Sequence, residues 1–216
     1  MTENKPVRAA QIWNRREEAM AHNVMDIRCP NCNAAVAPGQ QVCEWCHQPV
    51  IITSFTSVQD MPLPLVNKYA AAYRNMLGGD PDNPALNKSV GLCYLKLGLY
   101  DRATEAFGKA MEENFDDSEV YFYAAVCLLK GKMAFLTPRA DIDRAEEYLR
   151  AALMIEPRGI YHYFLAYLKY DFFERKYLYT SPGWQECLQA SLAAGLSYYD
   201  VDSFYALLGV AKPPVL

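Results

Sequence analysis

From Leu65 to the C-terminus, apolar residues recur at intervals of three and four positions, and Gly, Pro or Asp residues separate one such stretch from the next. This spacing places the apolar side chains on one face of an α-helix, because a helix turns once in about 3.6 residues. Gly and Pro commonly follow the end of a helix. The pattern therefore predicts a succession of amphipathic helices over residues 65–216.

Part of this pattern repeats with a fixed period. Residues 84–117 carry small or aromatic residues at positions 8, 11, 20, 24 and 27 of a 34-residue unit: Gly91, Tyr94, Ala103, Phe107 and Ala110. Small residues are needed where two antiparallel helices approach closely, and aromatic rings fill the space toward the next unit. The spacing resembles that of the tetratricopeptide repeat (TPR).

A second unit begins at Ser118, with Cys127 at the position that Cys93 occupies in the first. Matching positions in two repeats predict that both thiols lie in the core. The segment 130–143, between the two helices of this unit, is about eight residues longer than a standard TPR turn. The residues that continue the repeat pattern are Ala125, Ala145, Leu149, Ala152 and Pro157.

Similar patterns flank these two units. Residues 66–83 fit the second helix of a preceding half-repeat. Residues 160–197 resemble a third repeat, in which Tyr167 is too bulky for its position unless the register shifts by one residue to Ala166. The last apolar stretch, 198–210, is predicted to cap the stack, since the end of a solenoid must cover an exposed apolar face.

The resemblance implies an all-α TPR solenoid of about three repeats plus a capping helix. Pro62 and Pro64 make a stiff, extended segment plausible before the first repeat helix. Four regions are predicted: an N-terminal helical arm at 1–28, a four-cysteine module at 29–50, a linker at 51–64 and the solenoid at 65–216.

In TPR arrays the first helix of each repeat lines a concave groove that typically holds a peptide or a partner helix. The resemblance therefore implies binding to a protein or peptide partner. For the aromatic candidates, core packing between repeats is the alternative. The residues predicted to face the groove are Lys88, Lys96, Glu119, Phe122, Lys130, Tyr161 and Phe164.

Some TPR proteins hold the acidic tails of heat-shock chaperones with a clamp of polar and basic residues. This chain keeps Lys88 at one clamp position but has Leu92, Tyr123 and Leu165 where polar residues are expected. The resemblance therefore does not extend to a chaperone-tail receptor. The insertions at 130–143 and 169–183 fall inside successive repeats, so they are expected to crowd one edge, which is a second candidate surface.

Two Cys-x-x-Cys pairs separated by ten residues define the module at 29–50: Cys29 and Cys32, then Cys43 and Cys46. Each pair can curl into a turn whose thiolates point the same way, and two such turns complete a tetrahedron around zinc. So short a segment has no core of its own, so the metal would supply most of its folding free energy. Four thiolates leave no open position, which predicts a structural Zn²⁺ rather than a catalytic one.

Other interpretations of these cysteines fit less well. Redox chemistry usually involves one Cys-x-x-Cys at a helix start among alternating strands and helices, which is not the pattern here. His47 could replace a ligand, but four better-spaced cysteines are present. The segment resembles the minimal zinc ribbons of bacterial proteins; it lacks the further residues of the Ran-binding-type fingers that bind RNA or ubiquitin.

Composition supports a folded intracellular protein. Hydrophobic residues make up 52% of the 216, and the formal net charge of -4 opposes general nucleic-acid binding, which needs a basic surface. The first twenty residues carry charges throughout, unlike a signal peptide or membrane span. These features predict a cytoplasmic protein without a membrane segment.

No motif for catalysis is evident. The three histidines are scattered, and no Walker loop, GxSxG elbow or HExxH helix is present. Nothing points to a small-molecule substrate. The sequence therefore favours a non-enzymatic adaptor or scaffold with a TPR groove and a zinc ribbon as accessory contact. The alternative is a regulatory protein whose ribbon contacts nucleic acid or a nucleic-acid machine.

Overall fold

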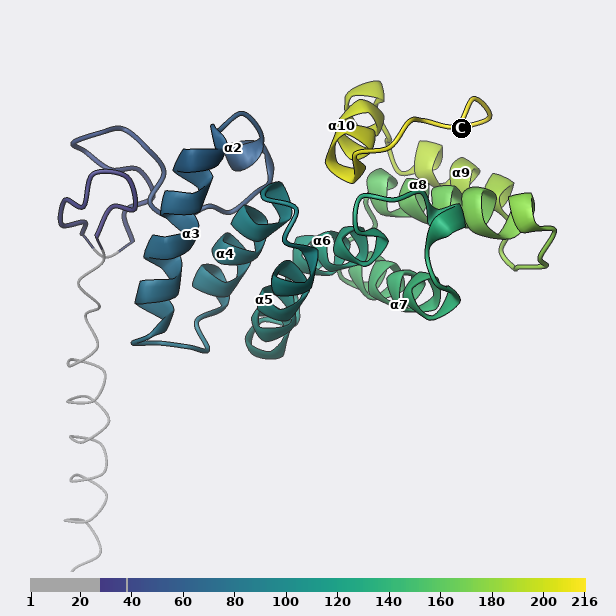
Figure 1. Cartoon of the computed structure of the whole chain (residues 1–216). Helices are drawn as coiled ribbons and strands as arrows, with labels where there is room; N and C mark the ends of the chain where they lie inside the picture. The colour runs from purple at the N-terminus through teal and green to yellow at the C-terminus, as the bar shows by residue number, and fades with distance from the viewer. Residues whose placement is uncertain (1–27, 38) are drawn as a thin grey trace, which may run out of the picture. The chain divides into compact units, whose positions relative to one another are not determined.

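The computed structural model describes residues 28–37 and 39–216 in two compact units, the second of which is Ile51–Leu216. The predicted N-terminal arm, apart from Arg28, and Pro38 lie outside the described residues. The second unit is entirely helical (Figure 1). Its α-helices are α2 (Thr56–Gln59), α3 (Leu63–Leu77), α4 (Pro84–Lys96), α5 (Tyr100–Glu113), α6 (Ser118–Leu129), α7 (Arg139–Ile155), α8 (Gly159–Leu168), α9 (Trp184–Ala193) and α10 (Tyr198–Leu208).

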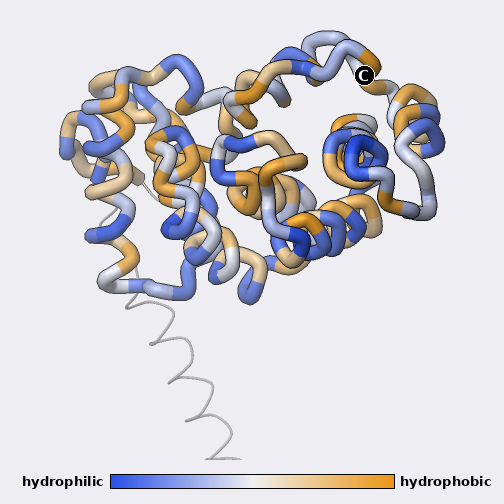
Figure 2. The backbone as a smooth tube through the Cα atoms, turned by 45° about the vertical axis from the view of Figure 1, so that its right-hand side comes forward, coloured by the Kyte–Doolittle hydropathy of each residue, from blue (hydrophilic) through white to orange (hydrophobic). Residues whose placement is uncertain are grey.

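The helices pack as successive hairpins. Helix α4 pairs with α5, α6 with α7, and α8 with α9, while α3 precedes the first pair and α10 packs on α6 and α8. Hydrophobic and hydrophilic stretches alternate along these helices (Figure 2). This is an all-α array of three helical pairs, preceded by α3 and followed by a final helix, α10, so the predicted all-α fold class is confirmed. Among the described residues, no helix is long and apolar enough to cross a membrane.

Capping residues fix where the helices begin. The Asn83 side chain accepts a hydrogen bond from Leu86 N (3.0 Å) at the start of α4, directly before Pro84. Asp117 caps α6 in the same way, through Glu119 N. Ser197 and Asp200 form a capping box on α10. Each cap satisfies a backbone N–H that lacks a partner within its helix.

In the first hairpin, the two helices approach closely at a small residue, Gly91. A Cβ atom added at Gly91 would lie 2.7 Å from the Phe107 ring, which is fully buried. In the second repeat the corresponding pair is Ala125 and Leu149, also fully buried. A larger residue on one helix is therefore matched by a smaller one on the other, as close packing requires.

In the third repeat, the bulky Tyr167 packs against residues outside that repeat. Tyr167 is fully buried, and its ring lies 5.9 Å from the ring of Phe204 and 5.7 Å from that of Tyr205 in α10. Its hydroxyl accepts a hydrogen bond from Ala134 N (3.2 Å). The ring thus packs on the capping helix and the insertion, and Ala166, also fully buried, is the neighbouring small residue.

The segment expected to be a linker belongs to the solenoid. Ile52 and Val58 are fully buried, and Ser89 Oγ donates a hydrogen bond to Ile52 O (2.8 Å). The segment forms α2, which packs on α4. The prolines therefore do not create a free extended spacer; Pro62 precedes α3 as its N-cap residue, and Pro64 lies in the helix's first turn.

The two insertions lie against each other. The first contains a 3₁₀ turn at Ala134–Leu136, and the second continues α8 through a π-helical turn at Lys169–Phe173 and a 3₁₀ turn at Glu174–Lys176. Phe135 N donates a hydrogen bond to the buried Asp171 carboxylate (2.8 Å). Both insertions are ordered parts of one edge of the second unit.

The close contact between Gly91 and Phe107 predicts that a substitution at one position can be partly compensated by a substitution at the other. Gly91→Ala should lower the free energy of unfolding by about 1–3 kcal/mol, because the fully buried ring has no room to move. Adding Phe107→Leu, which copies the second repeat, should recover part of that loss. Urea denaturation followed by circular dichroism measures both changes.

The matched control is Gly108→Ala on α5, where an added Cβ meets nothing within 4 Å. It should leave stability unchanged or raise it by up to about 1 kcal/mol, since alanine favours the helix. Equal losses for Gly91→Ala and Gly108→Ala would contradict the packing argument.

Candidate functional site

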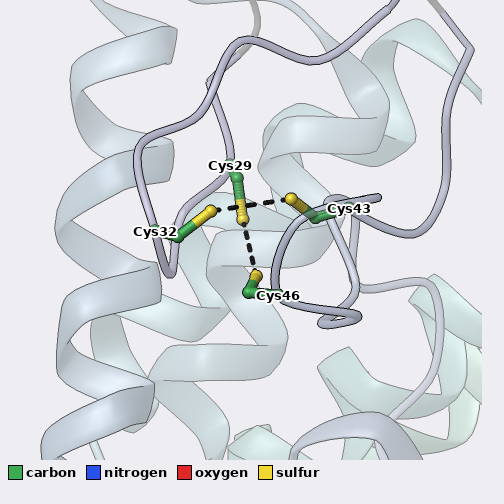
Figure 3. Close-up of side chains that lie close together, drawn as sticks. All are labelled: Cys29, Cys32, Cys43 and Cys46. Carbon is green, nitrogen blue, oxygen red and sulfur yellow. Dashed lines mark hydrogen bonds between the residues drawn. The ribbon is translucent and has the colours of Figure 1, made fainter.

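The four predicted ligands converge in the first unit. The sulfur atoms of Cys29, Cys32, Cys43 and Cys46 all lie within 4.8 Å of one another (Figure 3). The Sγ atoms of Cys29 and Cys46 are 3.5 Å apart, and those of Cys32 and Cys43 are 3.6 Å apart. These separations are too long for disulfides, whose S–S bond is about 2.05 Å.

Two equivalent turns carry the cysteines. The Cys29 N–H donates to Ala34 O, and the Cys43 N–H donates to Gln48 O, both at 2.9 Å. Isolated β-bridges close the turns, from Arg28 to Ala35 and from Val42 to Pro49. Each bridge therefore joins the two sides of one turn.

His47 contributes its backbone to the second of these two equivalent turns. It follows the second turn as Asn33 follows the first, with φ of 55° and 62° respectively. Its N–H donates to Cys43 O at 2.9 Å, and the corresponding bond runs from Asn33 to Cys29. His47 is exposed, and the cluster of potential ligands found in the described chain consists of the four cysteines without it.

Thiol pKa values differ within the cluster. The pKa of Cys29 is raised from 9.0 to about 12, chiefly by burial; side-chain hydrogen bonds with Cys46 and Cys32 add to the rise, and backbone hydrogen bonds from Cys32 and Asn31 oppose it. Burial also acts to raise the pKa of Cys46, but hydrogen bonds from the Gln48 backbone and from Cys29 and Cys32 lower it to about 6. The Cys46 thiol therefore loses its proton more readily than the Cys29 thiol.

This donor set fits a tetrahedral metal ion. Metal–sulfur bonds of about 2.3 Å would place the four sulfurs about 3.8 Å apart, and a cation would stabilise all four thiolates. The Sγ separations of 3.5 and 3.6 Å are slightly below that value, and no separation exceeds it by more than about 1 Å. Small movements of the turns would complete the tetrahedron, and the closed ligand set leaves no position for a substrate.

The remaining cysteines are core residues, as predicted for Cys93 and Cys127. Cys93 and Cys127 are fully buried and Cys187 is nearly so. Burial raises the pKa of the Cys93 thiol to about 12 and also raises that of Cys127. Their thiols therefore stay protonated and unreactive at neutral pH.

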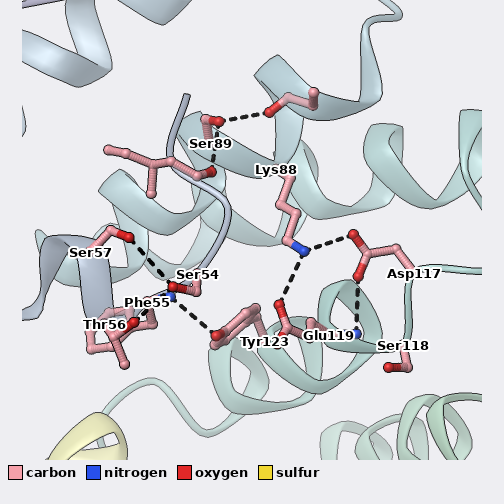
Figure 4. Close-up of polar contacts among 12 residues, drawn as sticks. Ser54, Phe55, Thr56, Ser57, Lys88, Ser89, Asp117, Ser118, Glu119 and Tyr123 are labelled. Atoms are coloured by element: carbon pink, nitrogen blue, oxygen red, sulfur yellow. Dashed lines mark hydrogen bonds and ion pairs between the residues drawn. The ribbon is translucent and has the colours of Figure 1, made fainter. Parts of the chain in front are cut away.

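Several residues predicted to face the groove form ion pairs or hydrogen bonds within the second unit. Lys88 Nζ lies 2.7 Å from the Asp117 carboxylate and 3.2 Å from that of Glu119 (Figure 4). Arg158 reaches Glu119 at 3.0 Å, and Tyr161 shares a hydrogen bond with Ser118. This ion network links the starts of α4, α6 and α8, so its members hold neighbouring repeats together.

The other lysines predicted for the groove also have partners. Lys96 Nζ donates to Gln59 O and so caps the C-terminus of α2. Lys130 has the left-handed conformation that ends α6, and its ammonium lies 2.6 Å from Asp101.

Three aromatic candidates lie in the core. Phe122 is 7% exposed, Tyr161 1% and Phe164 0%. Their rings pack together, with centroids 5.4 Å apart for Phe122 and Tyr161 and 5.9 Å for Phe122 and Phe164. Core packing therefore accounts for these positions, because rings this buried present little or no surface to a partner.

Of the residues predicted to face a groove, Phe122 alone borders the opening in this region. A cavity of about 140 Å³ lies between α2 and α10 over α6 and α8, and its lining is mainly apolar. The Phe55 N–H donates to the Tyr123 hydroxyl (3.2 Å), which fixes α2 beside α6. We define the apolar groove as Phe55, Thr56, Gln59, Phe122, Tyr123, Ile160, Tyr199, Asp200, Ser203, Phe204 and Leu207.

The repeat register did not reveal most of these residues, since α2 and α10 lie outside the repeats. The available signal was the pair Phe55 and Val58 in the presumed linker, whose spacing of three is helical.

Comparisons with known proteins give structural likeness only. No protein-family model matches the chain, and no curated protein sequence matches it. Among solved structures, the match to MamA of MSR-1 covers 70% of this chain and 79% of the MamA chain, at 20% identity and a TM-score of 0.46. The match to MamA of AMB-1 covers 67% of this chain and 82% of that MamA chain, at 21% identity and a TM-score of 0.44.

The sulfur cluster predicts metal uptake that depends on all four thiols. The chain, once stripped of metal under reducing conditions, should bind a single Co²⁺ ion with the visible spectrum of a tetrahedral tetrathiolate site. Cys43→Ser should weaken binding strongly and change the spectrum, whereas Cys187→Ala should do neither. Uptake should fall as pH falls, because protons compete for the thiolates. An unchanged spectrum for Cys43→Ser would contradict the assignment.

The ion network predicts measurable coupling between repeats. In a double-mutant cycle of Lys88→Met and Asp117→Asn, which preserves the side-chain cap, the coupling energy should be about 1 kcal/mol because both groups are largely buried. The exposed pair of Arg139 and Asp143 is the control and should give about 0.3–0.5 kcal/mol. Urea denaturation provides all the values; equal coupling in the two cycles would contradict the structural role.

Proposed function

We propose that this protein is a cytoplasmic, non-enzymatic adaptor that binds a protein or peptide partner in the apolar groove. The observation that carries the proposal is the groove itself, an apolar opening framed by helices from both ends of the solenoid. Such a surface suits one or two large apolar side chains of a partner, which supply binding free energy on burial.

Rigid surroundings favour binding at this position. Phe204 packs against Phe164 at a centroid distance of 4.8 Å, and Phe55 is held by its hydrogen bond to Tyr123. A preformed groove loses little conformational entropy when a ligand enters. Tyr199 is 71% exposed beside the opening and can add contact area at the rim.

The proposed metal is Zn²⁺, held by Cys29, Cys32, Cys43 and Cys46. Four thiolates with Cys-x-x-Cys spacing suit zinc in a structural site. In this role the metal orders residues 29–50 and presents Trp45, which is 76% exposed at the tip of the second turn, as an accessory contact for a partner. Trp45 lies between two ligands, so its fluorescence should report zinc removal while the helical signal persists.

Two arginine substitutions on α10 test the groove. Ser203→Arg places a long charged side chain in the opening, whereas Ala206→Arg adds the same charge at an exposed residue outside it. Ser203→Arg should weaken partner binding by at least about tenfold, and Ala206→Arg should leave it unchanged.

The assay begins with affinity purification of the tagged wild-type chain and both variants, followed by mass spectrometry. A protein recovered with wild type and Ala206→Arg but not with Ser203→Arg is then purified, and its affinity for each form is measured directly. Thermal unfolding confirms that both variants fold. Partners recovered equally by the two variants would reject the groove as the binding surface.

A further inference from the structure

A second groove lies between α3 and α5, with α4 as its floor. It has a volume of about 310 Å³ and shares no residue with the apolar groove. Its apolar lining includes Leu77, Val90 and Ala106. Exposed cationic side chains come from the two flanking helices: Arg74 from α3, and Arg102 and Lys109 from α5. We name it the basic groove.

The charge of this groove opposes that of the whole chain. Three cationic residues and a single acidic one, Glu105, line it, although the formal net charge of the protein is -4. Glu105 pairs with Lys109 at 3.6 Å, but both side chains are largely exposed, so the pair is weak. The groove therefore retains an excess of positive charge.

Its two arginines are available to a ligand. Within the described chain, neither Arg74 nor Arg102 forms a side-chain hydrogen bond or an ion pair, in contrast to Arg158 and Lys88 of the inter-repeat network. An incoming carboxylate would break no existing ion pair to reach them. Guanidinium groups bind carboxylates through two parallel hydrogen bonds, which adds geometric selectivity.

The mixture of surfaces indicates the class of ligand. Apolar side chains on the floor suit an apolar side chain of the ligand, and arginines at the rim suit carboxylates next to it. Nucleic acid is disfavoured, because an acidic protein repels a phosphate backbone and two free arginines displace few counterions. We propose that the basic groove binds an acidic peptide segment of a partner protein, with glutamate or aspartate beside a large apolar residue.

This site goes beyond the proposed function, since it would operate whether or not the apolar groove binds a partner. Together the two grooves would let one chain hold two different segments at once. Linked contacts of this kind raise the overall affinity for a partner that carries both segments.

Selection from a phage-displayed library of random peptides tests the basic groove. The bait is the full chain loaded with zinc, and peptides that also bind the double variant Arg74→Glu/Arg102→Glu are removed. The enriched peptides should be acidic and contain a large apolar residue. Synthesised and labelled, they should bind the double variant at least about tenfold more weakly than wild type in fluorescence anisotropy.

Matched controls separate the groove from general charge effects. Arg144→Glu alters an exposed arginine on α7 outside the groove and should leave affinity unchanged, as should Ser203→Arg in the apolar groove. Thermal unfolding checks that the double variant folds. The proposal is overturned if no enriched peptide depends on Arg74 and Arg102, if the enriched peptides are not acidic, if Arg144→Glu causes the same loss, or if a single-stranded oligonucleotide displaces the peptides at equal concentration.

Discussion

The second unit depends on the need of each helical hairpin to bury its apolar face against the next hairpin. No pair of helices in a solenoid has a core of its own, so stability comes from contacts between neighbours. At both ends the stack would expose an apolar face. In this protein α2 packs on α4 near the N-terminal end, and α10 packs on α8 and α6 near the C-terminal end.

Helices α2 and α10 also frame the apolar groove. Because α10 brings Phe204 against Phe164 and Tyr167, these aromatic residues of α8 become core. The surface left open lies between the end helices, where Ser203 and Phe55 border the same cavity. Because α2 and α10 pack on the first helices of the repeats, the apolar groove lies between these two helices and over α6 and α8.

Polar contacts also join neighbouring repeats. The ammonium of Lys88 reaches α6, and Arg158 reaches Glu119 on the same helix, so charges near the helix starts hold successive repeats in register. In the first unit, sulfur atoms take the place of a core. The four cysteines gather two short turns that bury little apolar surface, which is the circumstance in which a metal ion contributes most to folding.

The sequence by itself determined the local features. Helical periodicity, the 34-residue spacing of small and aromatic residues, and the Cys-x-x-Cys spacing depend on residues close together in the chain or fixed by the repeat, so they identified the solenoid and the four sulfurs. Only the tertiary structure decided the use of Lys88, Phe122 and Tyr161, because a repeat register predicts which face of a helix a residue occupies but not what covers that face. The answer came from α2 and α10, which lie outside the repeat pattern and pack through contacts far apart in the sequence.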